Sequence, residues 1–120
     1  MLDFTVTHHA GISVLQLNGE ANGDETVPAL NGAFGLVQPD DDLVLELSET
    51  TDLDAGAAAT VHEMMQARPA GSEIIVVSPR NHISQQLALH GVDHVGRIVR
   101  TMAEALDVLA AVRAFDEPHA

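Results

Sequence analysis

The sequence of 120 residues contains no cysteine, no lysine, no tryptophan and no tyrosine. Without cysteine, the chain has no disulfide, no thiolate metal ligand and no cysteine nucleophile. Its five basic residues are all arginine and stand against 18 acidic residues, which gives a formal net charge of -13. Nucleic acids and anionic lipid surfaces are bound through clustered Lys and Arg. The composition therefore argues against nucleic acid or a bare membrane surface as the partner.

The chain also lacks a long apolar run. No stretch approaches the roughly 20 apolar residues of a membrane span, and residues 1–9 carry Asp3 but no basic residue, unlike a secretory signal. We therefore expect a soluble, cytoplasmic protein without membrane insertion. A hydrophobic content of 46% is high for a disordered acidic chain. We expect one domain over residues 1–120, with a core of about 2–114 and a flexible tail at 115–120.

Hydrophobic periodicity predicts the order of the elements. Continuous or alternating apolar residues indicate strands, and apolar residues three or four apart indicate helices. We expect four to five strands, at 4–7, 12–17, 43–47, 74–77 and, as the fifth, the shorter 95–99, with a hairpin turn at 8–11. We expect about four helices, at 27–37, 57–65, 83–90 and 102–112. Helices between the later strands favour parallel right-handed crossovers, which predicts an α/β fold with a mixed sheet.

Several segments carry a resemblance to a known family. A hydrophobic strand, a turn with an aspartate and a helix follow one another in "LVLELSETTDLDAGAAATVHEMM", which begins at residue 43. "LNGEAN" precedes it, and "EIIVVSP", "NHISQQLALHGVD" and "RTMAEAL" follow in order. From residue 42 to 106 the chain resembles the STAS domain of bacterial anti-sigma factor antagonists. The resemblance implies a non-catalytic, protein-binding signalling module in the regulation of transcription. Its implied partner is an anti-sigma factor or a serine-kinase-like regulatory protein.

The sequence departs from the family at the start of the second helix. In family members that switch by phosphorylation, a serine at this helix start receives a phosphate from the partner kinase. Alignment on Asp54 places Ala55 and Gly56 where the family has two serines, and Ala57 where it has a glycine. Because Gly56 replaces the serine, we expect no phosphoacceptor at the family position. The nearby hydroxyl residues stand at other positions; they are Ser48, Thr50, Thr51 and Thr60.

The same helix start is the candidate partner-binding site. Asp54 is placed to cap the helix, and Ala57 and Ala58 to pack against the sheet. The expected contact residues are Asp52, Asp54, Ala55, Gly56, Ala57 and Thr60.

No motif in the sequence points to catalysis, a cofactor or a metal ion. No serine lies in a G-x-S-x-G elbow, and no glycine-rich nucleotide motif is present. His90 and His94 are four apart, but Gly91 separates them, and two imidazoles leave a zinc site incomplete. We therefore expect no enzyme activity, no cofactor and no metal site.

Two other functions remain open within the resemblance. STAS domains also serve as subunits of lipid-transporting ABC assemblies, which would make a transporter ATPase subunit the partner. The missing phosphoacceptor fits such a constitutive subunit at least as well as a switch. A STAS module that senses a small ligand is the third alternative.

Overall fold

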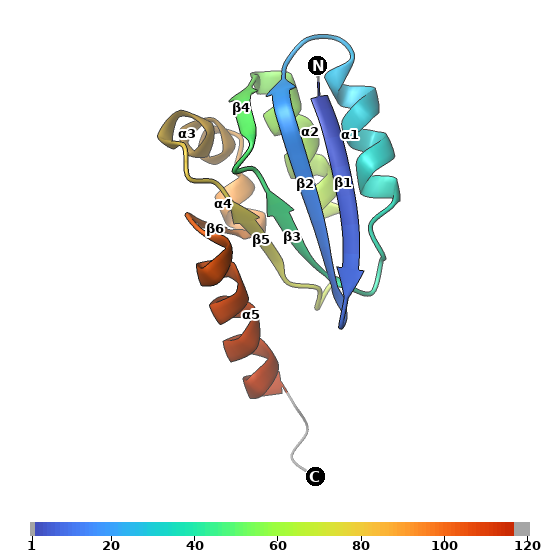
Figure 1. Ribbon diagram of the computed structural model, residues 1–120, viewed down its shortest axis with the longest axis vertical. Coiled ribbons are helices and arrows are strands. Elements are labelled where there is room, and N and C mark those ends of the chain that lie inside the picture. Colours follow the sequence, from blue (N-terminus) through green and yellow to red (C-terminus); the bar gives the residue numbers. More distant parts are fainter. Residues whose placement is uncertain (1, 117–120) are drawn as a thin grey trace.

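A computed structural model describes residues 2–116 (Figure 1). In chain order the elements are β1 (Leu2–His9), β2 (Ile12–Ala21), α1 (Thr26–Gly35), β3 (Asp42–Glu46), β4 (Thr50–Leu53), α2 (Ala55–Gln66), β5 (Ile74–Val77), α3 (Asn81–Leu89), α4 (Val92–Val95), β6 (Arg97–Val99) and α5 (Met102–Asp116). No helix in this part of the chain is long and apolar enough to cross a membrane.

The six strands form one mixed sheet in the order β1-β2-β3-β5-β6, and β4 pairs with the end of β2. β1 runs antiparallel to β2, whereas the other pairs are parallel. Figure 1 shows α1 and α2 behind the sheet and α5 on its near side. The predicted α/β fold with a mixed sheet is confirmed.

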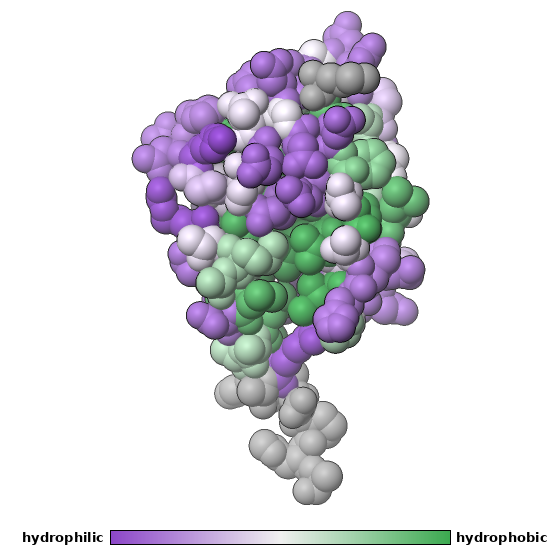
Figure 2. Space-filling model, viewed as in Figure 1, coloured by the Kyte–Doolittle hydropathy of each residue, from purple (hydrophilic) through white to green (hydrophobic). Residues whose placement is uncertain are grey.

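Two hydrophobic clusters hold these layers together. Along β3, Leu43 and Leu45 belong to the larger cluster under α1 and α2, while Val44 points to the smaller cluster under α5. Ile74 and Ile75 of β5 divide in the same way. Both strands read as continuous apolar runs because both of their faces are buried. Figure 2 shows the α5 side, where hydrophobic surface lies beside α5 and hydrophilic surface covers most of the upper part.

The structure corrects several predicted boundaries. The hairpin turn comprises only Ala10 and Gly11, so His8 and His9, predicted as turn residues, continue β1. The predicted strand over 95–99 is shorter, because residues 92–95 form the helix α4. Helix α5 reaches Asp116, beyond the predicted core limit of 114, and the rest of the predicted tail lies outside the described residues.

Strand β4 was missed because its sequence, TTDL, shows no apolar alternation. Thr50, which looks like a turn residue in the sequence, is fully buried, and its hydroxyl donates to the Leu17 carbonyl at 2.8 Å. Its backbone pairs with Gly19 at the end of β2. This pairing lengthens the sheet next to β2 and carries the chain to the start of α2.

The hairpin turn between β1 and β2 is strained at Ala10. Ala10 has φ +52° and Gly11 has φ +79°, the left-handed conformations of a type I′ turn. An alanine in this region carries a steric cost that glycine and asparagine largely avoid. A residue distant in sequence stabilises the turn, because Arg113 of α5 donates to the Ala10 carbonyl at 2.9 Å and pairs with Asp42 at 3.5 Å.

We expect Ala10→Asn to raise the free energy of unfolding by about 1 kcal/mol, because asparagine tolerates positive φ in a type I′ turn. Chemical denaturation monitored by circular dichroism measures the change. The matched control is Ala10→Val, which should destabilise the protein because a β-branched side chain is disfavoured at positive φ. Equal stability of the two variants would contradict the strained turn.

Candidate functional site

Two loops meet at one end of the sheet, where β2 and β4 both finish. The strands are parallel there, with Ala21 opposite Leu53. The β2–α1 loop, residues 22–25, and the β4–α2 connection, which consists of Asp54, therefore leave the sheet side by side. The predicted partner-binding residues lie in or next to these connections.

Asp54 joins these two loops. It has extended backbone geometry, and its Oδ1 accepts the Ala57 N–H at 2.8 Å, so it is the N-cap of α2, as predicted. Its Oδ2 accepts the Gly23 N–H from the other loop at 3.1 Å. Asp52 makes a parallel connection, because its Oδ2 accepts from the Asn22 side-chain amide at 2.6 Å. Two carboxylates thus fix the β2–α1 loop against the start of α2.

The exposed part of the site is narrower than the sequence predicts. Ala55 and Gly56 are exposed and Asp52 and Asp54 are half-buried, whereas Ala57 is 1% and Thr60 8% exposed. The Thr60 hydroxyl donates inward to the Gly56 carbonyl at 2.9 Å. The side chains of Ala57 and Thr60 therefore pack inside the protein. The accessible residues are Asp52, Asp54, Ala55 and Gly56, which together form the 52–56 surface, whereas Leu53 between them is buried.

Gly56 occupies ordinary helical backbone. It is not among the residues with positive φ, and a Cβ built there would meet only Asp54 Oδ1, at 3.6 Å. A side chain therefore fits at this position without strain. The glycine leaves the first turn of α2 bare at the surface.

The neighbouring hydroxyl residues differ in accessibility. Thr50 is fully buried, as described above. Thr51 is exposed, and its hydroxyl donates to the Gly19 carbonyl at 3.3 Å. Ser48 is half-buried, with both its N–H and its hydroxyl bound to Glu46 Oε1. None of these side chains lies on the first turn of α2.

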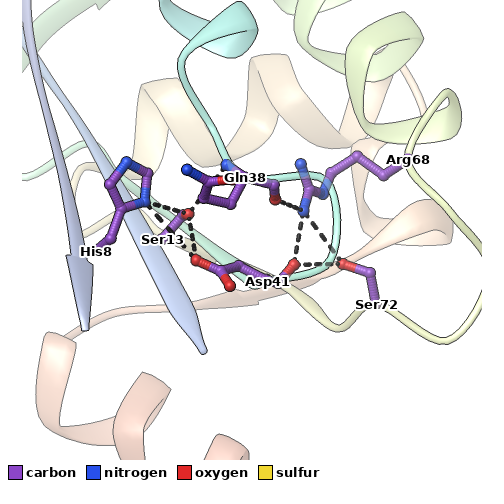
Figure 3. Close-up of polar contacts among 6 residues, drawn as sticks. All are labelled: His8, Ser13, Gln38, Asp41, Arg68 and Ser72. Carbon is purple, nitrogen blue, oxygen red and sulfur yellow. Dashed lines mark hydrogen bonds and ion pairs between the residues drawn. The ribbon is translucent and has the colours of Figure 1, made fainter. Parts of the chain in front are cut away.

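A second polar cluster, not identified from the sequence, lies at the opposite end of β2 (Figure 3). Ser13 Oγ is 2.8 Å from both His8 Nδ1 and Asp41 Oδ2. The backbone N–H of Gln38 also donates to Ser13 Oγ, at 3.3 Å. These residues come from β1, β2 and the loop before β3, and they share no sequence motif.

The geometry of this cluster is not that of a serine nucleophile. In a catalytic triad the imidazole lies between the serine and the carboxylate and takes the hydroxyl proton. Here Ser13 lies between the other two, donates its single proton to Asp41, and is fully buried. His8 must then present an N–H from Nδ1. The cluster ties β1 and β2 to the loop before β3.

Arg68 extends this cluster to the end of α2. Its Nη2 donates to the carbonyls of Gln38 and Asp41, at 3.1 and 2.6 Å, and lies 3.4 Å from Ser72 Oγ. Burial lowers the pKa of Arg68, and the charges of Asp41 and Asp42 oppose the shift. Arginine remains charged even so. The guanidinium holds the loop before β3, so this arginine belongs to the scaffold.

We expect Asp54→Ala to lower the free energy of unfolding by about 0.5–2 kcal/mol, because α2 loses its cap and the two loops lose their connection. Asp54→Asn should lie between wild type and Asp54→Ala, since its one amide oxygen retains only part of the pattern. Thermal unfolding with hydrogen exchange at 22–25 measures both effects. Asp107→Ala, on the exposed face of α5, is the control. Unchanged exchange at 22–25 in Asp54→Ala would contradict the connection.

No protein-family model matches the sequence, and no curated protein matches it significantly. The structure is similar to an anti-sigma factor antagonist from Mycobacterium paratuberculosis, with a TM-score of 0.73 and 24% identity over 90% of this chain and 93% of that one. It is also similar to the anti-sigma factor antagonist SpoIIAA in its unphosphorylated form, with a TM-score of 0.65 and 15% identity over 90% of this chain and 98% of that one.

A third similar structure is the murine Solute Carrier 26 family member A9 anion transporter, with a TM-score of 0.64 and 14% identity. This match covers 88% of the present chain and 18% of the transporter. At these identities the property held in common is the fold. The chain therefore has the STAS-like fold of anti-sigma factor antagonists, as its motif order predicts.

Proposed function

We propose that this chain is a non-catalytic, protein-binding regulatory module that docks on an anti-sigma factor or a related serine-kinase-like regulator in the cytoplasm and so controls transcription. The docking surface is the accessible site at 52–56. The observation that carries the proposal is the Asp54 carboxylate, which binds the Ala57 and Gly23 N–H groups together. It holds the exposed start of α2 in one conformation before any partner arrives.

Pre-organisation is an advantage in protein recognition. Ordering a loop on binding costs free energy, and a loop that is already ordered avoids that cost. The small residues Ala55 and Gly56 also let a partner approach the backbone of α2 closely. The surface supports binding better than chemistry, because its carboxylates are engaged in hydrogen bonds and the buried Ser13 cluster lacks the geometry of a nucleophile.

We expect the surface to act constitutively, without phosphorylation at the start of α2. Incubation with a kinase of the anti-sigma factor class and ATP should leave wild type unlabelled, because Gly56 has no hydroxyl. Gly56→Ser should acquire label, since the position is exposed and accepts a side chain. Phosphopeptide mass spectrometry identifies the labelled residue. Label on wild type anywhere between 48 and 60 would contradict constitutive action.

The partner itself is tested by native purification of the tagged chain and mass spectrometry. We expect an anti-sigma factor or kinase-like regulator to be enriched over a control bait. Recovery of the control bait's own partner, with no such regulator on the tagged chain, would contradict the proposal.

We expect Gly56→Asp to weaken binding to the recovered partner at least about tenfold, because a carboxylate buried without a counter-charge costs several kcal/mol and about 1.4 kcal/mol corresponds to tenfold in Kd. Gly56→Ala and Gly56→Asn are the matched controls, since they add the Cβ and the side-chain shape without the charge. All three should melt close to wild type, because the position has room and unstrained φ. Isothermal titration measures the Kd values. Equal affinity of Gly56→Asp and Gly56→Asn would remove 52–56 from the interface.

The likeness to the anion transporter favours a second candidate, a constitutive STAS subunit or domain in a transporter complex. Co-purification of a transporter ATPase subunit, in place of a kinase-like regulator, would select it. A small-ligand-sensing module is distinguished by calorimetry with nucleotides and fatty acids, because the docking proposal requires neither ligand.

A further inference from the structure

The outer edge of β1 is long and unpaired. β1 has eight residues and lies at the end of the sheet, and no other strand within residues 2–116 pairs with that edge. Its pairing with β2 is continuous from Leu2 opposite Gly19 to His9 opposite Ile12, without a bulge. It carries neither proline nor lysine. Proteins commonly protect such edges with bulges, prolines or several charged side chains. Asp3 is the only acidic residue of β1, so this edge has little of that protection and is a template for strand pairing.

The hydrogen-bond pattern shows which backbone groups point outward. The Gly11 carbonyl accepts from the Asp42 N–H at 2.9 Å, so the backbone groups of Gly11 point toward β3. Backbone groups alternate along a strand, so those of the next residue, Ile12, point toward β1. Residues 12, 14, 16 and 18 lie opposite the odd-numbered residues of β1. The backbone N–H and C=O groups of these odd-numbered residues therefore form their hydrogen bonds with β2. The even-numbered residues of β1 therefore present their N–H and C=O groups at the free edge. These residues are Leu2, Phe4, Val6 and His8.

We propose that this edge pairs antiparallel with β1 of a second copy of the chain, with Val6 opposite Val6. An antiparallel pair of identical strands is self-complementary about a twofold axis. Only even-numbered residues can bond across this edge, so the shared register must place even opposite even. Phe4 then bonds with His8 of the second copy on either side of the central pair. The two sheets become one continuous sheet.

Polar cross-strand pairs favour this register over its neighbours. With Val6 at the centre, Asp3 lies opposite His9 of the second copy, and the pair occurs twice. Thr5 lies opposite Thr7 of the second copy between these pairs. If the register shifts by two residues in one direction, Asp3 lies opposite Thr7 of the second copy. If it shifts by two residues in the other direction, Asp3 has no residue of β1 opposite it. Polar and opposite-charge cross-strand pairs stabilise a sheet, and the Val6 register alone brings carboxylate and imidazole together.

The twofold arrangement determines where helix α1 of each copy lies. Helix α1 lies on the far side of the sheet beside the N-terminal half of β1 (Figure 1), and Ala29 and Leu2 line the same hollow. The twofold therefore places the two α1 helices along opposite halves of the strand pair. Phe4, 37% exposed on the α1 side, gains a neighbouring strand. The pairing leaves the 52–56 surface of each copy free.

Sedimentation equilibrium of the full chain tests the proposal. Wild type should approach twice the 12.7 kDa of one chain, and its association should strengthen with added salt, which screens the repulsion between two copies of charge -13. Val6→Pro should be monomeric, because it removes an outward N–H that proline on an edge strand can lack. Its melting temperature should fall, because Val6 packs against the larger core cluster and the stabilisation from association is lost, but its circular dichroism spectrum should remain that of a folded chain. Val6→Ile, which keeps the N–H, should dimerise. A monomeric wild type at all salt concentrations would overturn the proposal.

A charge swap tests the register without proline. His9→Asp places two carboxylates opposite each other twice and should raise the dimer Kd about two- to thirty-fold. Asp3→His combined with His9→Asp restores the pair and should return the Kd toward wild type. His94→Asp changes the net charge equally at a side chain that is 83% exposed on α4, and should leave the Kd near wild type. A dimer that survives both Val6→Pro and His9→Asp unchanged would use another surface and would overturn the proposal.

Discussion

The candidate site depends on one carboxylate that accepts hydrogen bonds from two separate segments. Asp54 binds the N–H of Ala57 in its own helix and the N–H of Gly23 in the loop after β2. Backbone N–H groups at a helix start are otherwise unsatisfied, so this side chain both begins α2 and fixes the neighbouring loop. The exposed residues Ala55 and Gly56 follow directly after this connection. The surface proposed to bind a partner, 52–56, thus owes its conformation to Asp54, a residue with a structural role.

The position of that surface depends on the sheet, and buried hydrophobic residues hold the helices on the two faces of the sheet. β3 and β5 divide their side chains between two clusters, which fixes α1 and α2 on one face and α5 on the other. At the far end of β2, Ser13 and Arg68 connect the loop before β3 to the strands and to the end of α2. α2 is thus held at both ends, by Asp54 and by the guanidinium. A partner that contacts its first turn meets a rigid element.

Much of this arrangement could be predicted from the sequence. The apolar runs 43–47 and 74–77 indicate buried strands, and Asp54 before an alanine-rich segment indicates a helix cap; both predictions are confirmed. β4 could not be predicted, because a short polar segment becomes a strand only through pairing with β2. The Ser13 cluster was missed because Ser13 and Asp41 are 28 positions apart in the sequence and share no motif with His8 or Gln38. Burial of Ala57 and Thr60 depends on the rotation of α2 against the sheet, which composition alone does not give.

The central claim is that a partner binds the pre-ordered surface at 52–56 and the loop fixed to it. Hydrogen–deuterium exchange of the chain, with and without the partner recovered from its native complex, tests this claim most directly. We expect new protection at 22–25 and at 52–56, since the partner would cover both segments together. Protection confined to α5 or to β6, with unchanged exchange in both loops, would contradict the account.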